Sequence, residues 1–108
     1  MVLAPFTYSD LQGSKRRPAC VVSARSYNDN NPDAVLAMVT SSRARVESPG
    51  QGDFVVNDWQ AAGLMLPSVV RAGRLLVLEQ RVIGRTLGDL ATTDLQGVDA
   101  ALRLVLGL

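Results

Sequence analysis

The sequence has no histidine, a single lysine and a single cysteine, and aromatic residues make up only 5% of its 108 residues. Without histidine, the chain lacks the commonest general base and metal ligand of proteins. Its cysteine, aspartate and glutamate residues form no cluster with the spacing of metal ligands. These absences argue against a metalloenzyme and against a histidine-dependent catalytic triad, so we expect neither a metal site nor a cofactor.

Long apolar runs are also missing from the sequence. No stretch reaches the length needed to cross a membrane, and the start, "MVLAPFTYSD", lacks the basic and apolar regions of a signal peptide. The lone cysteine, Cys20, excludes an internal disulfide, and its apolar neighbours fit a buried thiol in a reducing compartment. We therefore expect a cytoplasmic protein without a membrane segment, folded as one domain over residues 1–108.

Charge is nearly balanced, with a formal net charge of +1 at pH 7, so the chain as a whole has no strong attraction for nucleic acid. The kind of cation is more informative, because every basic residue except Lys15 is an arginine. The planar guanidinium fork suits phosphate and carboxylate groups. An arginine-rich genome would give the same composition, so the positions of the arginines matter more than their number.

Short apolar segments between polar stretches predict a mainly β fold. We expect strands over residues 2–6, 18–24, 34–42 and 53–58, with a polar loop over residues 7–17. Residues 68–79 predict two further strand pieces, interrupted at Ala72 and Gly73, where the glycine suggests a β-bulge. Residues 25–33 and 43–52 have the composition of a turn and of an exposed loop.

The C-terminal segment predicts an amphipathic helix, with Thr92 or Thr93 as its N-cap. Its apolar residues recur at spacings of three and four, on one helical face: Leu95, Val98, Leu102 and Val105. Several short strands followed by one terminal helix describe a small β-barrel or curled sheet that the helix covers.

Two polar clusters stand at the ends of apolar strands. Arg17 ends the basic run "KRR" (Lys15, Arg16 and Arg17) before one strand, and Thr40 begins "TSS" (Thr40, Ser41 and Ser42) at the end of the next. If these strands are antiparallel neighbours, Arg17 lies near Thr40. A guanidinium and hydroxyls at one rim would form a small anion site suited to phosphate. Each cluster alone is more typical of an ordinary solvated loop or turn than of a functional site.

Arg71 is a third candidate, because it follows two β-branched residues directly before the expected bulge. If its strand lines the same groove, Arg71 adds a second cation to the site. The alternative is an exposed arginine on a half-buried strand.

The order of these pieces resembles the MazF/PemK family of bacterial toxin endoribonucleases. The resemblance rests on "GSKRRPACVVS", "MVTSS" and "DWQAAGLMLPSVVR", in that order, and it extends over nearly the whole chain. It implies an SH3-like, CcdB-type small barrel with a terminal helix, a homodimer, and a groove for single-stranded RNA. It also implies metal-independent cleavage, in which the ribose 2′-hydroxyl attacks the adjacent phosphate, and a cognate antitoxin as protein partner.

The resemblance also implies roles for individual residues. Arg17 matches the family's catalytic arginine, Thr40 its catalytic threonine, and Arg71 an arginine that some members use in catalysis. Further contacts to RNA would come from the residues around these positions: Lys15, Arg16, Ser41, Ser42, Arg43 and Tyr8. The sequence departs from members that place an aspartate two residues after the "VVR" arginine, because Gly73 stands there. Arg17 and Thr40 are therefore the minimal catalytic pair.

Two other functions remain open on the residues alone. A non-catalytic module on the same barrel would bind RNA without cutting it, or bind a protein target such as gyrase. A scaffold whose polar clusters are only turns would bind neither.

Overall fold

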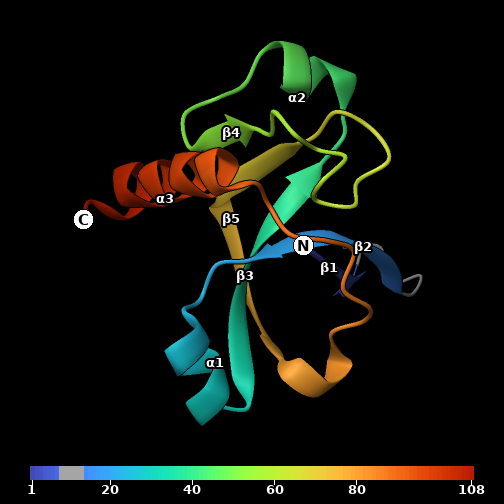
Figure 1. Ribbon diagram of the computed structural model, residues 1–108, viewed down its shortest axis with the longest axis vertical. Coiled ribbons are helices and arrows are strands. Elements are labelled where there is room, and N and C mark those ends of the chain that lie inside the picture. The colour runs from blue at the N-terminus through green and yellow to red at the C-terminus, as the bar shows by residue number, and fades with distance from the viewer. Residues whose placement is uncertain (8–13) are drawn as a thin grey trace.

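The computed structural model describes residues 1–7 and 14–108. Its strands are β1 (Val2–Thr7), β2 (Ser14–Val21), β3 (Asp33–Thr40), β4 (Asp53–Val55) and β5 (Val69–Glu79). Its helices are α1 (Arg25–Asn30), α2 (Arg43–Glu47) and α3 (Thr92–Leu106), with a 3-10 turn, η1 (Gln80–Val82), after β5. The strands form one antiparallel sheet in the order β1-β2-β3-β5-β4, and α3 lies across β4 and β5 (Figure 1). Within the described residues, no helix is long and apolar enough to cross a membrane.

The mainly β fold with a C-terminal helix is confirmed, but the sheet is not closed into the expected barrel. Its two outer strands, β1 and β4, do not pair with each other. β4 has only three residues, fewer than its predicted range, and it pairs with β5 alone. On the other side, the outer edge of β1 is covered by residues 84–87: the Leu3 amide donates to the Arg85 carbonyl, and Val2 bridges Thr86. In a closed barrel β1 would have no free edge. Here the extended segment 84–87 covers that edge instead.

β2 begins earlier than the sequence indicated. The basic run Lys15–Arg17 was expected in a loop, yet it belongs to the strand. The reason is the partner strand, because the β1–β2 pairing continues as far as Thr7 and Ser14 and gives each of these residues a ladder position. Arg17 therefore occupies a fixed strand position, opposite Ala4, instead of a loop tip.

The β-bulge predicted at Ala72 and Gly73 is present, although β5 is one continuous strand instead of two pieces. Ala37 of β3 pairs with Leu75, whereas its neighbour Met38 pairs with Arg71, so residues 72–74 have no partners on β3. The Ala72 amide instead donates to the Gly52 carbonyl at 2.8 Å. β3 pairs with β5 on both sides of this irregularity, and β4 pairs with residues 69–71 on the other edge of β5.

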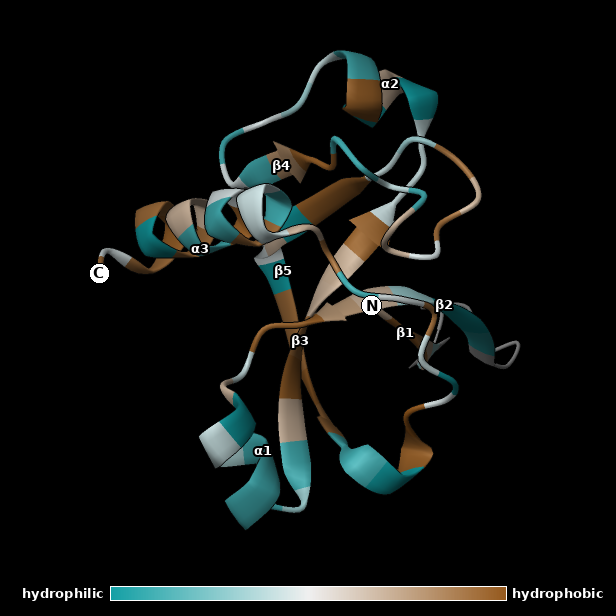
Figure 2. Ribbon diagram, viewed as in Figure 1, coloured by the Kyte–Doolittle hydropathy of each residue, from teal (hydrophilic) through white to brown (hydrophobic). Residues whose placement is uncertain are grey.

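The core consists of two clusters on opposite faces of the sheet, as the alternation of side chains along β3 requires. Ala37 and Val39 belong to the cluster that contains Val98 of α3 and the buried Cys20. Ala34 and Leu36 belong to the second cluster, which also contains Ala4 and Ala19. Figure 2 shows β3 coloured hydrophobic over most of its length and α1 coloured hydrophilic.

The C-terminal helix is in the expected place but differs in detail. Its N-cap is Ala91, and neither Thr92 nor Thr93 caps it. The buried carboxylate of Asp94 lies in the first turn and accepts hydrogen bonds from the amides of Asn57 and Asp58. Of the predicted apolar face, Val98 is buried and Leu102 packs on the core, while Leu95 and Val105 are exposed.

Two stretches expected to be irregular form short helices, α1 and α2. In α1, tertiary and local hydrogen bonds supply what composition did not show: the Asn28 side chain donates to the Ser23 carbonyl, and the Gln80 side chain donates to the Asn28 and Asn31 carbonyls. The Gln80 bonds satisfy carbonyls at the end of the helix, and the Asn28 bond ties the helix to the residues before it, which stabilises a helix too short to be stable alone.

Candidate active site

The pairing of β2 with β3 brings together the two polar clusters that the sequence singled out. Ala19 pairs with Met38 in an antiparallel register. Arg17 lies two residues before Ala19 and Thr40 two residues after Met38, so both residues extend from the same end of this antiparallel ladder. Both residues line a pocket of about 520 Å³, which confirms the expectation that they lie near each other. The volume is within the usual range for ligand sites.

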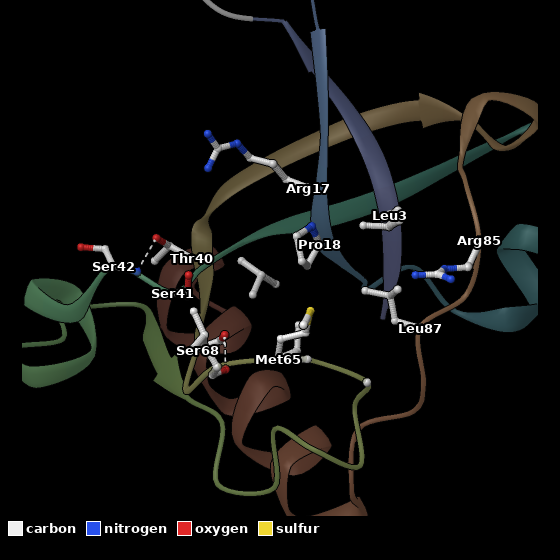
Figure 3. Close-up of a pocket in the computed structure, with 14 residues that line it drawn as sticks. Leu3, Arg17, Pro18, Thr40, Ser41, Ser42, Met65, Ser68, Arg85 and Leu87 are labelled. Carbon is white, nitrogen blue, oxygen red and sulfur yellow. Dashed lines mark hydrogen bonds between the residues drawn. The ribbon is translucent and has the colours of Figure 1, made fainter.

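The pocket has a polar rim and an apolar floor. The rim is formed by Arg17 within β2, Thr40 at the end of β3, and Ser41 and Ser42 directly after it. Figure 3 shows the Arg17 side chain extending on the same side as Thr40, whereas Pro18 points toward Met65. The arrangement follows from strand alternation, because consecutive residues of β2 point to opposite faces of the sheet.

The Thr40 hydroxyl is oriented by its own backbone. The Ser42 amide donates to Thr40 Oγ1 at 3.1 Å. Because this oxygen already accepts a hydrogen bond, its remaining proton can be donated to an anion at the rim. Arg17 supplies the formal positive charge there, and the arrangement can hold a phosphate group between a charged donor and a neutral one.

Arg71 lies on the same face of the sheet as Thr40 and Arg17, because it pairs with Met38, two residues before Thr40. It does not line the pocket. Its Nε donates to Asp53 Oδ1 at 3.3 Å, and the Asp53 side chain is only 4% exposed. Arg71 is therefore held by β4 at a distance from the rim.

Asp53 is a residue that sequence reasoning missed. It stands directly opposite Arg71, and its other carboxylate oxygen accepts the Gly50 amide at 2.8 Å and faces Arg45 at 3.5 Å. The acid beside Arg71 thus comes from the neighbouring strand instead of from position 73. No local signal in "GQGDFVV" could reveal this, since the contact depends on the register of β4 with β5.

The remaining predicted RNA contacts are distributed unevenly. Ser41 and Ser42 line the pocket, whereas Lys15 and Arg16 are exposed on β2 outside it. Arg43 also lies outside, 92% exposed and paired with Glu47 at 2.9 Å. Tyr8 lies outside the described residues.

The far side of the pocket contains residues that the sequence did not indicate. Arg85 follows η1 in the extended segment beside β1, and Met65 lies in the loop before β5. The two walls meet closely at Gly63, which has φ of +79° and lies against the Leu87 carbonyl so tightly that a side chain would clash there. In the part of the chain that the structure describes, no group of three histidine, cysteine, aspartate or glutamate residues is placed to hold a metal ion.

The chain matches, over residues 1–106, the family described as PemK-like, MazF-like toxins of type II toxin-antitoxin systems. This protein belongs to that family. No curated protein matches the sequence.

Solved structures with the same fold cover nearly the whole chain. The Mycobacterium tuberculosis toxin MazF-mt6 has a TM-score of 0.76 at 17% identity, over 100% of this chain and 98% of its own. An endoribonuclease from a mycobacterial species, in complex with its cognate antitoxin, has a TM-score of 0.75 at 20% identity, over 99% and 92%. A MazE-MazF structure from Deinococcus radiodurans has a TM-score of 0.74 at 28% identity, again over 99% and 92%.

Proposed function

We propose that this MazF-like toxin is an endoribonuclease that cleaves single-stranded RNA without requiring a metal ion. The observation that carries the proposal is the convergence of Arg17 and Thr40 at one pocket rim, in a chain of this toxin family. A similar fold in a mycobacterial endoribonuclease supports it. The protein acts in the bacterial cytoplasm, where its RNA substrate is.

The ribose 2′-hydroxyl of the substrate is the nucleophile. It attacks the adjacent phosphorus, so that a P–O2′ bond forms and the P–O5′ bond breaks. The 2′-oxygen loses a proton and the leaving 5′-oxygen gains one, which gives a 2′,3′-cyclic phosphate and a 5′-hydroxyl end. Because the nucleophile comes from the substrate, the protein needs to position the phosphate and stabilise its developing charge.

Arg17 and Thr40 divide this task. The Arg17 guanidinium stays charged at any ordinary pH, so its role is to stabilise the negative charge of the transition state. Thr40 donates its hydroxyl proton to a non-bridging phosphate oxygen, in the orientation set by the Ser42 amide. Arg71, paired with Asp53, contributes a more distant positive charge on the same face.

The test is cleavage of an unstructured RNA in EDTA, with analysis of the product ends. We expect Arg17→Ala to lower the rate by about 10²- to 10³-fold, the usual loss for a charge-stabilising donor. Thr40→Val keeps the β-branched shape, removes the hydroxyl, and should lower the rate about tenfold. Arg25→Ala is the matched control, because Arg25 is exposed on α1, away from the pocket.

Cyclic phosphate ends in EDTA, lost in both site variants and retained in the control, are the expected result. An unchanged rate in Arg17→Ala would remove Arg17 from the mechanism. Tight RNA binding without products would favour the second candidate, a non-catalytic binding module. Gly73 in place of an acid, and the Asp53 carboxylate that occupies Arg71, are the observations in favour of that module.

A cognate antitoxin is the proposed protein partner, since the similar mycobacterial endoribonuclease and Deinococcus MazF were each solved with an antitoxin or MazE. Its acidic segment would compete with RNA for the arginines of the rim. We also propose a homodimer. Apolar side chains at the end of α3 are more than half exposed: Leu104, Leu106 and Leu108. A monomer in sedimentation at micromolar concentration would contradict the dimer.

A further inference from the structure

The pocket continues from the catalytic rim across the sheet to a second cation, Arg85. Leu3 pairs with Pro18 of β2 on one side, and on the other its amide donates to the Arg85 carbonyl at 3.0 Å. Pro18, Leu3 and Arg85 thus form a row across three adjacent extended segments, and all three line the pocket. Two strand spacings separate the backbone of Arg85 from β2, which is about 10 Å.

The floor between these two cations is apolar and is faced by a wall. Leu3, Pro18 and Leu87 line the sheet side of the pocket. Met65 and Leu66 line the opposite side, and their exposed fractions are 89% and 57%. Figure 3 shows Met65 directed toward Pro18 across the gap. We call this gap, between Pro18 and Leu87 on one side and Met65 on the other, the apolar slot.

Arg85 is poised to bind a ligand. Four other arginines are paired with carboxylates: Arg43, Arg45, Arg71 and Arg81. For Arg85, by contrast, the described residues provide no ion pair or side-chain hydrogen bond. An exposed guanidinium at the end of an apolar slot retains its full capacity for a phosphate.

We propose that the apolar slot binds the base of the nucleotide next to the cleaved phosphate and that Arg85 binds the following phosphate. This inference rests on the proposed function. The slot matches one nucleotide step. Arg17 at the rim would face one phosphate, the apolar slot the base, and Arg85 the next phosphate. A flat base stacks on apolar side chains regardless of its sequence, and the Met65 thioether is polarisable enough to favour such a contact.

An RNA segment fits the slot better than an acidic peptide does. Once a phosphate is held by Arg17 and Thr40, the attached base must lie within one nucleotide of the rim. The apolar slot opens directly from that rim. In a peptide, no covalent linkage fixes an apolar group between two anionic groups at this spacing.

The experiment measures binding of a short, fully 2′-O-methylated RNA, which cannot be cleaved, at one fixed low salt concentration. Arg85→Ala should weaken binding by about tenfold, whereas Arg25→Ala, which removes the same charge elsewhere, should change it by less than about twofold. The backbone is then scanned with neutral methylphosphonate linkages. One linkage should weaken wild-type binding and have no effect in Arg85→Ala, because the charge that Arg85 recognises is already lost.

The slot is tested in the same way with an abasic nucleotide moved along the RNA. At one position the loss of the base should weaken wild-type binding about tenfold, and in Met65→Ser the same loss should be much smaller. Met65 is so exposed that this substitution leaves the fold intact. In cleavage assays, Arg85→Ala should raise KM without lowering kcat, since Arg85 binds ground state and transition state alike.

Equal affinities of Arg85→Ala and Arg25→Ala for RNA would overturn the proposal while leaving the endoribonuclease function in place. If Arg85→Ala weakened binding of a polyglutamate peptide but not of RNA, the slot would be a protein site and the proposal would be wrong. Failure of the wild-type protein to bind any RNA would overturn both the slot and the proposed function.

Discussion

Replacement of Asp94 should destabilise the fold through the loop that forms one wall of the candidate site. Asp94 is fully buried in the first turn of α3. Its two carboxylate oxygens accept the amides of Asn57 at 3.1 Å and Asp58 at 2.9 Å. These amides begin the loop that leads through Trp59 to Met65. The Asp94 side chain therefore links α3 to the loop that forms one wall of the pocket.

The size of the effect follows from these two bonds. Hydrogen bonds to a charged group contribute about 1.5 kcal/mol or more each, and Asp94→Ala also leaves two part-buried amide donors without partners. We expect a loss of about 3 kcal/mol in the free energy of unfolding. For a domain of this size, that corresponds to a fall of about 12 °C in Tm. Asp94→Asn keeps one acceptor but turns an amide donor toward the second N–H, so its loss should be about 2 kcal/mol.

The assay is urea unfolding followed by far-UV circular dichroism and by Trp59 fluorescence. Trp59 is the only tryptophan, and it lies in the fastened loop, so its signal should change before the global transition in the variants. Asp99→Ala, on an exposed position of the same helix, is the control. A loss below about 0.5 kcal/mol in Asp94→Ala, or an equal loss in the control, would refute the reasoning.

Two further predictions concern Cys20 and Gly73. Burial raises the pKa of the Cys20 thiol, so the folded state holds the thiol proton more tightly than the unfolded state. This contribution to the free energy of unfolding is present below the unfolded pKa of about 8.5 and is lost as the pH rises through the raised pKa of the folded state. Urea unfolding at alkaline pH should therefore show a loss of stability in the wild-type protein that Cys20→Ala lacks. Parallel stability–pH profiles of the two proteins would contradict this prediction. At Gly73 no heavy atom lies within 4 Å of an added Cβ, so Gly73→Asp should fold normally. If Arg71 takes part in the reaction, the new carboxylate should raise the cleavage rate about tenfold or more, and an unchanged rate would exclude position 73 as a base.

Local patterns predicted the elements whose contacts are local or strictly periodic. Apolar segments located the strands of the sheet, and Gly73 marked the region of the bulge. The order of "KRR" and "TSS" was enough to predict that Arg17 lies near Thr40, because in antiparallel neighbours the start of one strand lies beside the end of the next. The mainly β fold with a terminal helix was predicted correctly, but the sheet is open because its outer strands, β1 and β4, do not pair, and no strand pattern shows which strands will pair at the edges.

The amino-acid sequence by itself determined the family, the mainly β architecture and the two residues Arg17 and Thr40 at the pocket rim, because each depends on residue order along neighbouring strands. The tertiary structure alone decided what surrounds that rim. It paired Arg71 with Asp53, joined a loop to α3 through Asp94, and placed Met65 on one side of the apolar slot and Arg85 at its end. These contacts join segments far apart in the chain, and their geometry is set by strand register and packing that no local pattern encodes.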